Sequence, residues 1–290
     1  MPPSTSGNSA IDKQVQEKSN KLWGPFPDGY VTVGMCRVKT PMFATVEEER
    51  LHRKQRLAAM SRLFAKYGYD EGTTGHITCR DPENPETFWM NPYGVHFSQI
   101  KVSDLTLVNK KGEILYSNGD AYVNQAGVNL HSMLYEARPD IVCATHCHST
   151  YAKAFSSLVR LLDPITQDSC IFYEDHALYS NYEGIITGDE EGRRIAKALG
   201  KKKAAILCNH GLVTVGRTVD EAAFLTINME KCCQVQLLAE AACHGNEKPI
   251  QIDHECAKSV HELAGSKESC WFNFQPLYQT IVKEQPDLLL

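Results

Sequence analysis

The sequence predicts an α/β fold in which helices flank a central sheet. Short apolar runs of the length of a strand alternate with longer segments in which apolar residues recur at helical spacing. Glycine, proline and turn-forming pairs separate most of these segments. The chain has 290 residues, of which 42% are hydrophobic and 22% charged, so it can form one large α/β domain or two small ones.

Two long helices are predicted from capping-box patterns. Thr45 with Glu48, and later Thr218 with Glu221, precede apolar residues at helical spacing. In this motif the hydroxyl accepts a hydrogen bond from the backbone three residues on, and the acidic side chain accepts one from the backbone of the capping residue. The predicted helices cover about residues 46–67, 130–138, 150–158, 190–199 and 219–244.

The predicted strands fall into two groups. Four short β-type runs separated by turns predict a meander in the first half of the chain. Three buried apolar runs follow in the second half, two of them leading into histidines. These strands cover residues 76–79, 87–91, 105–108, 114–116, 141–145, 204–208 and 212–215, and residues 30–33 form a further extended stretch.

Charge and composition exclude several classes of partner. The formal net charge of −5 gives no basic field to attract nucleic acid, so a small molecule is the expected partner. No run of about 18 apolar residues exists to span a membrane, and residues 1–20 lack the apolar core of a signal peptide. We therefore expect a cytoplasmic protein. The eleven cysteines are scattered and form no CxxC pair, which predicts reduced thiols rather than disulfides or a cysteine zinc site.

Three histidines at strand ends form a candidate metal site. His146 and His148 follow a buried strand, and alternation of side chains in extended backbone points both to the same side. His210 ends a separate buried strand and precedes Gly211, which lets the backbone pass close to a ligand. Imidazole ligands suit zinc, iron, manganese or nickel. Spacing alone leaves a second interpretation open, in which these are partly exposed loop histidines.

Several segments resemble the signature of the class II aldolase and adducin family, and their order and spacing match over about residues 45–245. The segments are Leu130-His131-Ser132-Met133-Leu134-Tyr135, Ala137-Arg138-Pro139-Asp140, His146-Cys147-His148-Ser149, Asn209-His210-Gly211-Leu212, Gly216-Arg217-Thr218 and Glu221-Ala222.

The resemblance has consequences for fold, assembly and cofactor. It implies a three-layer αβα fold of the class II aldolase and adducin type, with a central mainly antiparallel or mixed sheet. It also implies a homo-oligomer, usually a tetramer, with active sites at subunit interfaces. His146, His148 and His210 would be the ligands of one divalent metal ion, which is Zn, Fe(II) or Mn.

The sequence departs from the sugar-phosphate aldolases that it resembles. In those proteins a glutamate shuttles protons beside the metal, and the corresponding position is Gly127, which has no titratable group. The serines that bind phosphate correspond to Gln125 and Ala126. The usual Gly-Asn loop reads Gly75-His76. A phosphorylated sugar is therefore not the expected substrate.

The other polar residues expected near the metal are candidates for acid/base or supporting roles. The interface tyrosine of the aldolases falls near Asp168. Each candidate also has a structural explanation: His131 as a histidine bonded to backbone, His76 in a surface turn and Asp168 as a surface carboxylate. The catalytic candidates are His131, Asp168, His76 and Gln125, and His96 is a further polar residue that could be solvated.

Glu174, Asp175 and His176 form a second group of potential metal ligands. A mixed acidic loop is usually hydrated, and a three-histidine site needs no further protein ligand. We therefore interpret this group as a solvated loop and predict no second metal.

The sequence divides into three parts. Residues 1–40 form a tail or arm, residues 41–245 carry the aldolase-like domain, and residues 246–290 lose strong periodicity. The aromatic residues of the last part need a cover. They pack on the domain or on a neighbouring subunit, or they form a lid over a neighbouring active site. These residues are Trp271, Phe272, Phe274 and Tyr278.

The leading functional hypothesis is a metal-dependent lyase. A metal on three histidines can hold a hydroxy- or keto-acid through two oxygens and withdraw charge from the carbon between them. Decarboxylation suits Gly127 better than retro-aldol cleavage, because no hydroxyl proton must be removed to start it. Two alternatives remain: an Fe(II), O2-dependent oxygenase that decarboxylates oxidatively with the same ligands, and a non-catalytic adducin-like binding protein.

Overall fold

The computed structural model describes residues 29–184 and 188–290. Most of the predicted N-terminal tail, residues 1–28, lies outside the described residues. The rest of the tail forms a hairpin of β1 (Tyr30–Val33) and β2 (Cys36–Lys39), of which the sequence predicts only the first strand. Val31 of this hairpin packs against Trp271.

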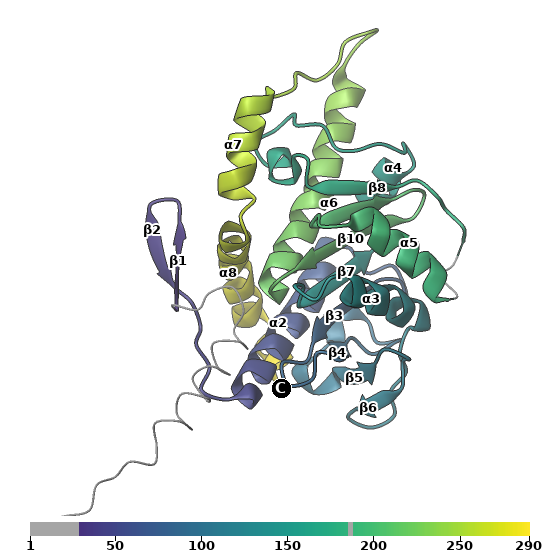
Figure 1. Ribbon diagram of the computed structural model, residues 1–290, viewed down its shortest axis with the longest axis vertical. Coiled ribbons are helices and arrows are strands. Elements are labelled where there is room, and N and C mark those ends of the chain that lie inside the picture. The colour runs from purple at the N-terminus through teal and green to yellow at the C-terminus, as the bar shows by residue number, and fades with distance from the viewer. Residues whose placement is uncertain (1–28, 185–187) are drawn as a thin grey trace, which may run out of the picture.

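An eight-stranded mixed sheet forms the centre of the protein (Figure 1). All neighbouring strands are antiparallel except the last two, which are parallel. This confirms the expected sheet type. In spatial order the strands are β6 (Ile114–Tyr116), β5 (Thr106–Asn109), β4 (Thr87–Met90), β3 (His76–Arg80), β7 (Cys143–Cys147), β10 (Gly211–Gly216), β9 (Ala204–Leu207) and β8 (His176–Tyr179).

Helices cover both faces of the sheet (Figure 1). One layer consists of α3 (Gln125–Ala137) and α5 (Asp189–Leu199). The other consists of α2 (Val46–Tyr67), α6 (Val219–Ala242) and α8 (Lys267–Glu284). The expected arrangement of a sheet between two helical layers is therefore confirmed.

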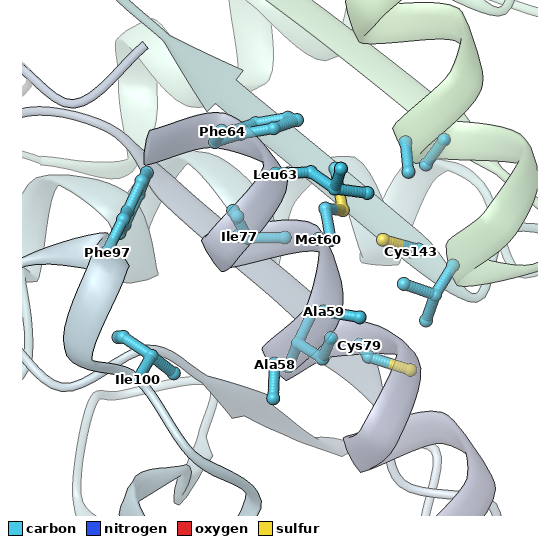
Figure 2. Close-up of a cluster of buried hydrophobic side chains, with 14 of the residues drawn as sticks. Ala58, Ala59, Met60, Leu63, Phe64, Ile77, Cys79, Phe97, Ile100 and Cys143 are labelled. Carbon is cyan, nitrogen blue, oxygen red and sulfur yellow. The ribbon is translucent and has the colours of Figure 1, made fainter. Parts of the chain in front are cut away.

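Side-chain alternation along β3 separates the two cores. Ile77 and Cys79 face α2, where they belong to the same buried cluster as Phe64 (Figure 2). Each fully buried side chain of this size contributes about 1.5–3 kcal/mol of hydrophobic stabilisation. His76 and Thr78, the intervening residues, contact α3 instead, because successive strand residues point to opposite faces. Polar residues of β3 thus line the α3 side of the sheet.

The two capping boxes form with one difference from the predicted pattern. The Thr45 hydroxyl accepts a hydrogen bond from the backbone of Glu48 (3.2 Å), as predicted. The Glu48 carboxylate, however, accepts from the backbone of Ala44 (2.8 Å), one residue before the cap. The second long helix repeats this shift, since Glu221 accepts from the backbone of Arg217 (2.7 Å). Both carboxylates therefore anchor the chain just ahead of the helix.

The C-terminal segment forms two helices that the sequence does not predict. α7 (His254–Ala264) leads into α8, which continues through Pro276. Proline removes one backbone donor and normally ends a helix, so the segment looks irregular in the sequence. Trp271 and Phe274 are buried whereas Phe272 is exposed. Part of the aromatic tail is therefore covered by its own chain.

The cysteines are free thiols, in agreement with the prediction. Most of them are buried in the cores, and those that are not are Cys36, Cys243 and Cys256. Within the described residues, no helix combines the length and the apolar character needed to cross a membrane.

Candidate metal centre

Three histidines from two separate segments of the sheet converge at one end of β7 and β10. His146 belongs to β7, His148 directly follows that strand, and His210 lies in the loop that joins β9 to β10. Their ligand nitrogens all lie within 4.8 Å of one another. The three rings are mutually perpendicular or nearly so, with centroids 4.7 to 4.8 Å apart. The structure thus brings together the three residues that the sequence singles out.

The backbone around His210 explains how this loop reaches the other two histidines. Asn209 has a φ of 53°, which makes the tight turn, and the backbone of His210 donates to the carbonyl of Leu207 (3.0 Å). Gly211 has a φ of 156°, and a β-carbon there would lie 2.4 Å from the carbonyl oxygen of Cys147. Only glycine permits this approach of β10 to the end of β7.

Hydrogen bonding orients the His146 ring for metal binding. Its Nδ1–H donates to the carbonyl of Leu212 (2.9 Å), so in the neutral ring the Nε2 lone pair is free. The Nε2 atoms of His146 and His148 are 2.9 Å apart. Two nitrogens bound about 2.0–2.1 Å from one ion at roughly a right angle have this separation. A hydrogen bond from His148 to His146 would also have this separation, but it would not account for the His210 imidazole, which has no hydrogen-bond partner within residues 29–184 and 188–290.

Burial keeps these imidazoles neutral at neutral pH. Desolvation, reinforced by the neighbouring imidazoles, lowers the pKa of His146 well below its ordinary value. Desolvation and the nearby Lys153 ammonium lower the pKa of His148. Desolvation and His148 lower the pKa of His210 to about 4. Neutral imidazoles carry the lone pairs that a metal needs, so the donor set fits a divalent cation.

These lowered pKa values predict a loss of stability in acid. An unfolded histidine binds a proton below about pH 6.5, whereas folded His210 does so only near pH 4, so protons favour the unfolded state between these values. The contribution of neutral His210 to the free energy of unfolding is therefore fully present above about pH 6.5, and it is lost as the pH falls toward about 4. Urea unfolding of the chelator-treated protein between about pH 7.5 and 4.5 measures this. A midpoint that stays constant over that range would contradict the prediction.

A chain of buried hydrogen bonds begins beside the three histidines. His76 lies opposite His146 in the β3–β7 register, with ring centroids 4.8 Å apart. Its Nδ1 contacts the Nε2 of His131 on α3 (2.9 Å), and the Nδ1 of His131 contacts the Thr78 hydroxyl (2.5 Å). That hydroxyl in turn contacts the Tyr135 hydroxyl (2.8 Å). Side chains therefore hold the His131 ring on both of its nitrogens. The alternative interpretation, in which His131 bonds to the backbone, is wrong.

This chain leaves one ring nitrogen of His76 unused. In one arrangement Tyr135 donates to Thr78, Thr78 donates to His131, and His131 donates to the Nδ1 of His76. The hydrogen of the neutral His76 ring then lies on Nε2. If every bond is reversed, the same nitrogen is a bare acceptor. His76 lines the cavity that contains the three histidines, so this nitrogen is the one available to a ligand.

Gly127 provides the space that the His76 ring occupies. A β-carbon on Gly127 would lie 2.7 Å from Cγ and 2.9 Å from Cδ2 of His76, closer than atoms can pack. The resemblance implies that the aldolases have a glutamate at the position of Gly127. In this protein the imidazole of His76, from β3, occupies the space beside that position. The sequence indicates the absence of the glutamate but not this replacement.

Two catalytic candidates from the sequence do not reach this cavity in the described chain. Gln125 is exposed, hydrogen-bonds to Asn129 (2.8 Å) and lies against the turn at Gly112. Asp168 is exposed at the start of a short 3-10 helix, and its carbonyl accepts from Asn228 (3.3 Å). Within one chain neither side chain lines the cavity, because both lie exposed at the start of a helix, and their catalytic roles stay predictions.

The other histidine candidates have structural partners. His96 is exposed and lies 2.9 Å from the carboxylate of Asp70, as its solvated interpretation suggests. His176 is buried at the start of β8, where Nδ1 donates to the carbonyl of Phe172 (2.6 Å) and Nε2 accepts from the backbone of Leu162 (2.9 Å). The interpretation of Glu174, Asp175 and His176 as a solvated loop was therefore wrong for His176. Asp175 of the same segment forms an ion pair with Lys203 (3.0 Å).

The cavity over the histidines has a volume of about 470 Å³, within the range of small-molecule sites. Within the described residues its wall contains no carboxylate, and Lys153 is its only cation. Gly75, Ala126 and Asn209 belong to segments that the resemblance had already related to the aldolases, whereas the other remaining wall residues lie in separate loops and show no motif. Together the remaining wall residues are Thr73, Thr74, Gly75, Tyr93, Asn124, Ala126, Tyr182, Gly184 and Asn209.

Glu230 of α6 holds the turn that follows His148. Its buried carboxylate accepts from the Ser149 hydroxyl (2.5 Å) and from the backbone of Tyr151 (2.9 Å) and Ala152 (2.7 Å), at the start of α4 (Thr150–Ser156). A carboxylate at a helix N-terminus is favourable. Nothing in the sequence links Glu230 to this turn, because the two are about 80 residues apart and meet only in the fold.

Replacing Glu230 with glutamine should weaken both the fold and metal binding. The amide keeps the shape but sets an N–H against a hydroxyl or backbone donor, which costs about 1–3 kcal/mol. Looser support of His148 should weaken zinc affinity by about 10- to 100-fold. Urea unfolding and competition with a chelating dye measure the two effects. Glu262→Gln, an exposed change on α7, is the matched control, and equal behaviour of both variants would refute the assignment.

Comparison with known proteins identifies relatives over most of the chain. The family model Class II Aldolase and Adducin N-terminal domain matches residues 55–237. The chain is 42% identical over 249 residues to 4-hydroxy-3-prenylphenylpyruvate oxygenase/4-hydroxy-3-prenylbenzoate synthase of Streptomyces roseochromogenus, which covers 86% of this chain and 88% of that protein. Over the same length it is 41% identical to Decarboxylase NovR of Streptomyces niveus, covering 86% and 90%.

A solved structure named L-fuculose 1-phosphate aldolase from Glaciozyma antarctica is similar in fold and sequence. It has a TM-score of 0.80 and 44% identity, and the match covers 87% of this chain and 96% of that one. The region that the family model matches, residues 55–237, contains all three converging histidines. The chain belongs to the class II aldolase and adducin family.

Proposed function

We propose that the protein binds one divalent metal ion through His146, His148 and His210 and cleaves a C–C bond in a small hydroxy- or keto-acid. The observation that carries this proposal is the convergence of three neutral imidazoles on a cavity of small-molecule size. When bound, the metal supplies Lewis-acid polarisation of substrate oxygens and, if it is Fe(II), a position for reaction with O2. Decarboxylation is preferred over retro-aldol cleavage.

The wall of the cavity favours an anionic substrate. Lys153 is its only described cation and forms an ion pair with Glu71, which lies outside the wall, and the described wall itself has no carboxylate to repel an acid. Thr73, Thr74 and Asn124 offer hydroxyl and amide groups for oxygen atoms. Two tyrosines at the cavity, Tyr93 and Tyr182, offer faces against which an aromatic part of a substrate can pack.

His76 would act on the substrate rather than on the metal. Its ring is fixed by the hydrogen bond to His131 and by close packing against α3 at Gly127. The unused Nε2 can donate a hydrogen bond to a substrate oxygen or accept one from a hydroxyl, depending on the direction of the hydrogen-bonded chain. A fixed donor next to developing negative charge stabilises it without reorganisation. His76 therefore takes the place in the cavity wall that a carboxylate at position 127 would have.

The second candidate function is an O2-dependent oxidative decarboxylation with Fe(II). The names of the two Streptomyces relatives, an oxygenase and a decarboxylase, support it. The described cavity wall also offers no carboxylate to carry a proton in an aldol reaction. An adducin-like binding protein without catalysis is the third possibility.

One set of measurements separates these functions. The protein is purified without oxygen, its metal is quantified, and 2-hydroxy- and 2-keto-acids with and without an aromatic ring are tested with O2 uptake recorded. Decarboxylation without O2 uptake supports the lyase, and uptake that matches turnover supports the oxygenase. A saturating metal at about 100 times its Kd should stabilise the fold by about 2.7 kcal/mol. Failure to bind or be stabilised by Zn, Mn or Fe would leave only the non-catalytic protein.

We also propose a homotetramer, in which Asp168 on the surface of one subunit approaches the cavity of another. Light scattering after size exclusion measures the mass. Asp168→Asn should lower activity in the tetramer if this approach occurs. A stable monomer with full activity would rule out both statements.

A further inference from the structure

A second cavity lies at the opposite end of the sheet from the histidines. Gly211 starts β10 beside His210, whereas Gly216 ends the same strand and lines this second cavity. A strand of this length spans roughly 17 Å, so the two cavities are separate. The second cavity has a volume of about 310 Å³, at the lower end of the range for small-molecule sites.

Positive charge predominates in the wall of this cavity, in a chain with a net charge of −5. Five basic side chains line it against three carboxylates. The basic residues are Arg138, Lys201, Lys203, Arg217 and Lys267, and the acidic residues are Asp175, Glu221 and Glu268.

Some of these cations are already neutralised. Lys203 lies 3.0 Å from the carboxylate of Asp175 and also donates to the carbonyl of Gly265 (2.7 Å). Lys267 lies 3.6 Å from Glu268, beyond hydrogen-bond distance. Arg138 is held by Asp140, outside the cavity wall (2.8 Å). Lys203 and Arg138 therefore add little net charge to the cavity.

Two cations are not neutralised by an ion pair. In the described chain no carboxylate lies within 4 Å of the Lys201 ammonium or the Arg217 guanidinium. Glu221 is close to Arg217, but it is buried and its carboxylate accepts from the backbone of Arg217 (2.7 Å), so it does not pair with the guanidinium. Arginine is well suited to bind phosphate through two parallel hydrogen bonds.

The backbone adds unsatisfied donors to the same wall. α8 begins here, and Ser266 caps it by accepting from the backbone of Ser269 (3.2 Å). The backbone N–H groups of Lys267 and Glu268 have no acceptor among the residues described. Free N–H groups at the start of a long helix, together with its dipole, favour an anion.

We propose that this cavity binds a small anion with a phosphate group, either inorganic phosphate or a small phosphate monoester. Arg217 and Lys201 would bind the phosphate oxygens from one side, and the start of α8 would bind them from the other. The site is independent of the proposed function, because none of its residues lines the cavity of the histidines.

Calorimetric titration with sodium phosphate, at an ionic strength matched with sodium chloride, tests the proposal on the metal-loaded protein. We expect saturable binding of one phosphate per chain. Arg217→Ala and Lys201→Ala should each weaken it by about tenfold, and Arg217→Glu should abolish it. Both residues are exposed, so these changes leave the core intact. Glycerol phosphate in place of phosphate distinguishes a monoester site from one that takes the free ion.

Two controls make the result decisive. Lys258→Ala removes an exposed lysine of α7 that forms no ion pair with any described residue, and it should leave phosphate binding unchanged. His210→Ala should also leave phosphate binding unchanged, because His210 does not line the second cavity. Phosphate bound at the metal centre would instead be lost in this variant. Phosphate binding that depends on His210 but not on Arg217, or no saturable binding in the native chain, would overturn the proposal.

Discussion

Replacing His146 with alanine is expected to remove both the bound metal and the activity. Its Nε2 lies 2.9 Å from that of His148, and its Nδ1–H is committed to Leu212, so the ring is the best oriented of the three ligands. Without it, two imidazoles remain, which is too few for a stable catalytic site. We expect the rate to fall more than about 1,000-fold, equivalent to about 4 kcal/mol of transition-state stabilisation. Metal content and turnover of the purified variant measure this.

His210→Ala separates the loss of metal from a loss of folding. The His146 change also leaves the carbonyl of Leu212 without its donor, which by itself costs about 1–3 kcal/mol. His210 has no such bond in the described structure, so its replacement should remove metal and activity with a smaller effect on the metal-free protein. His96→Ala, at an exposed histidine outside the cavity, should change neither. Full activity of the His146 or His210 variant would disprove the proposed metal centre.

Replacing Gly127 with alanine is expected to disable the site without touching the metal ligands. The new methyl group would lie 2.7 Å from Cγ of His76, so the ring must shift, and we expect this to disturb its hydrogen bond to His131. Overpacking of this kind costs about 1–3 kcal/mol of stability. Misplacement of a substrate-binding group by about 1 Å lowers the rate by about 100-fold. Urea unfolding and steady-state kinetics measure the two effects, and metal content should remain unchanged.

A double-mutant cycle tests whether the effect passes through His76. Removing the ring in His76→Ala also removes the clash, so the stability cost of Gly127→Ala should largely disappear in that background. Gly188→Ala is the matched control, because a β-carbon there meets no atom within 4 Å and the backbone conformation is ordinary. Additive effects of the two substitutions would show that Gly127 and His76 do not interact.

The histidine cluster could be predicted from the sequence because local rules place most of it. Alternation in β7 puts His146 and His148 on one side, and Gly211 marks the close approach of the loop that carries His210. The Thr45 cap was also predictable, since a capping bond spans only three residues. The resemblance to the family then related the segment of His146 and His148 to the loop that carries His210.

The surroundings of the cluster depended on the tertiary structure. Gln125 appeared close to the metal by its position in the chain, yet it lies against the turn at Gly112. His131 appeared equally consistent with a bond to backbone, and only the packing of α3 on β3 joins it to His76 and Thr78. Pro276 concealed α8, because a helix packed on two others tolerates a proline that an isolated helix would not.

By itself, the sequence determined the family, the layered fold and the identity of the three converging imidazoles. Periodicity and caps, which join residues a few positions apart, predicted the layered elements, and the resemblance to the family related the three imidazoles to one another. Only the tertiary structure decided that an imidazole fills the space beside Gly127 and that Glu230 supports the turn after His148. Such contacts join residues about 50 to 80 positions apart, and they depend on strand register and helix packing, which no local pattern records.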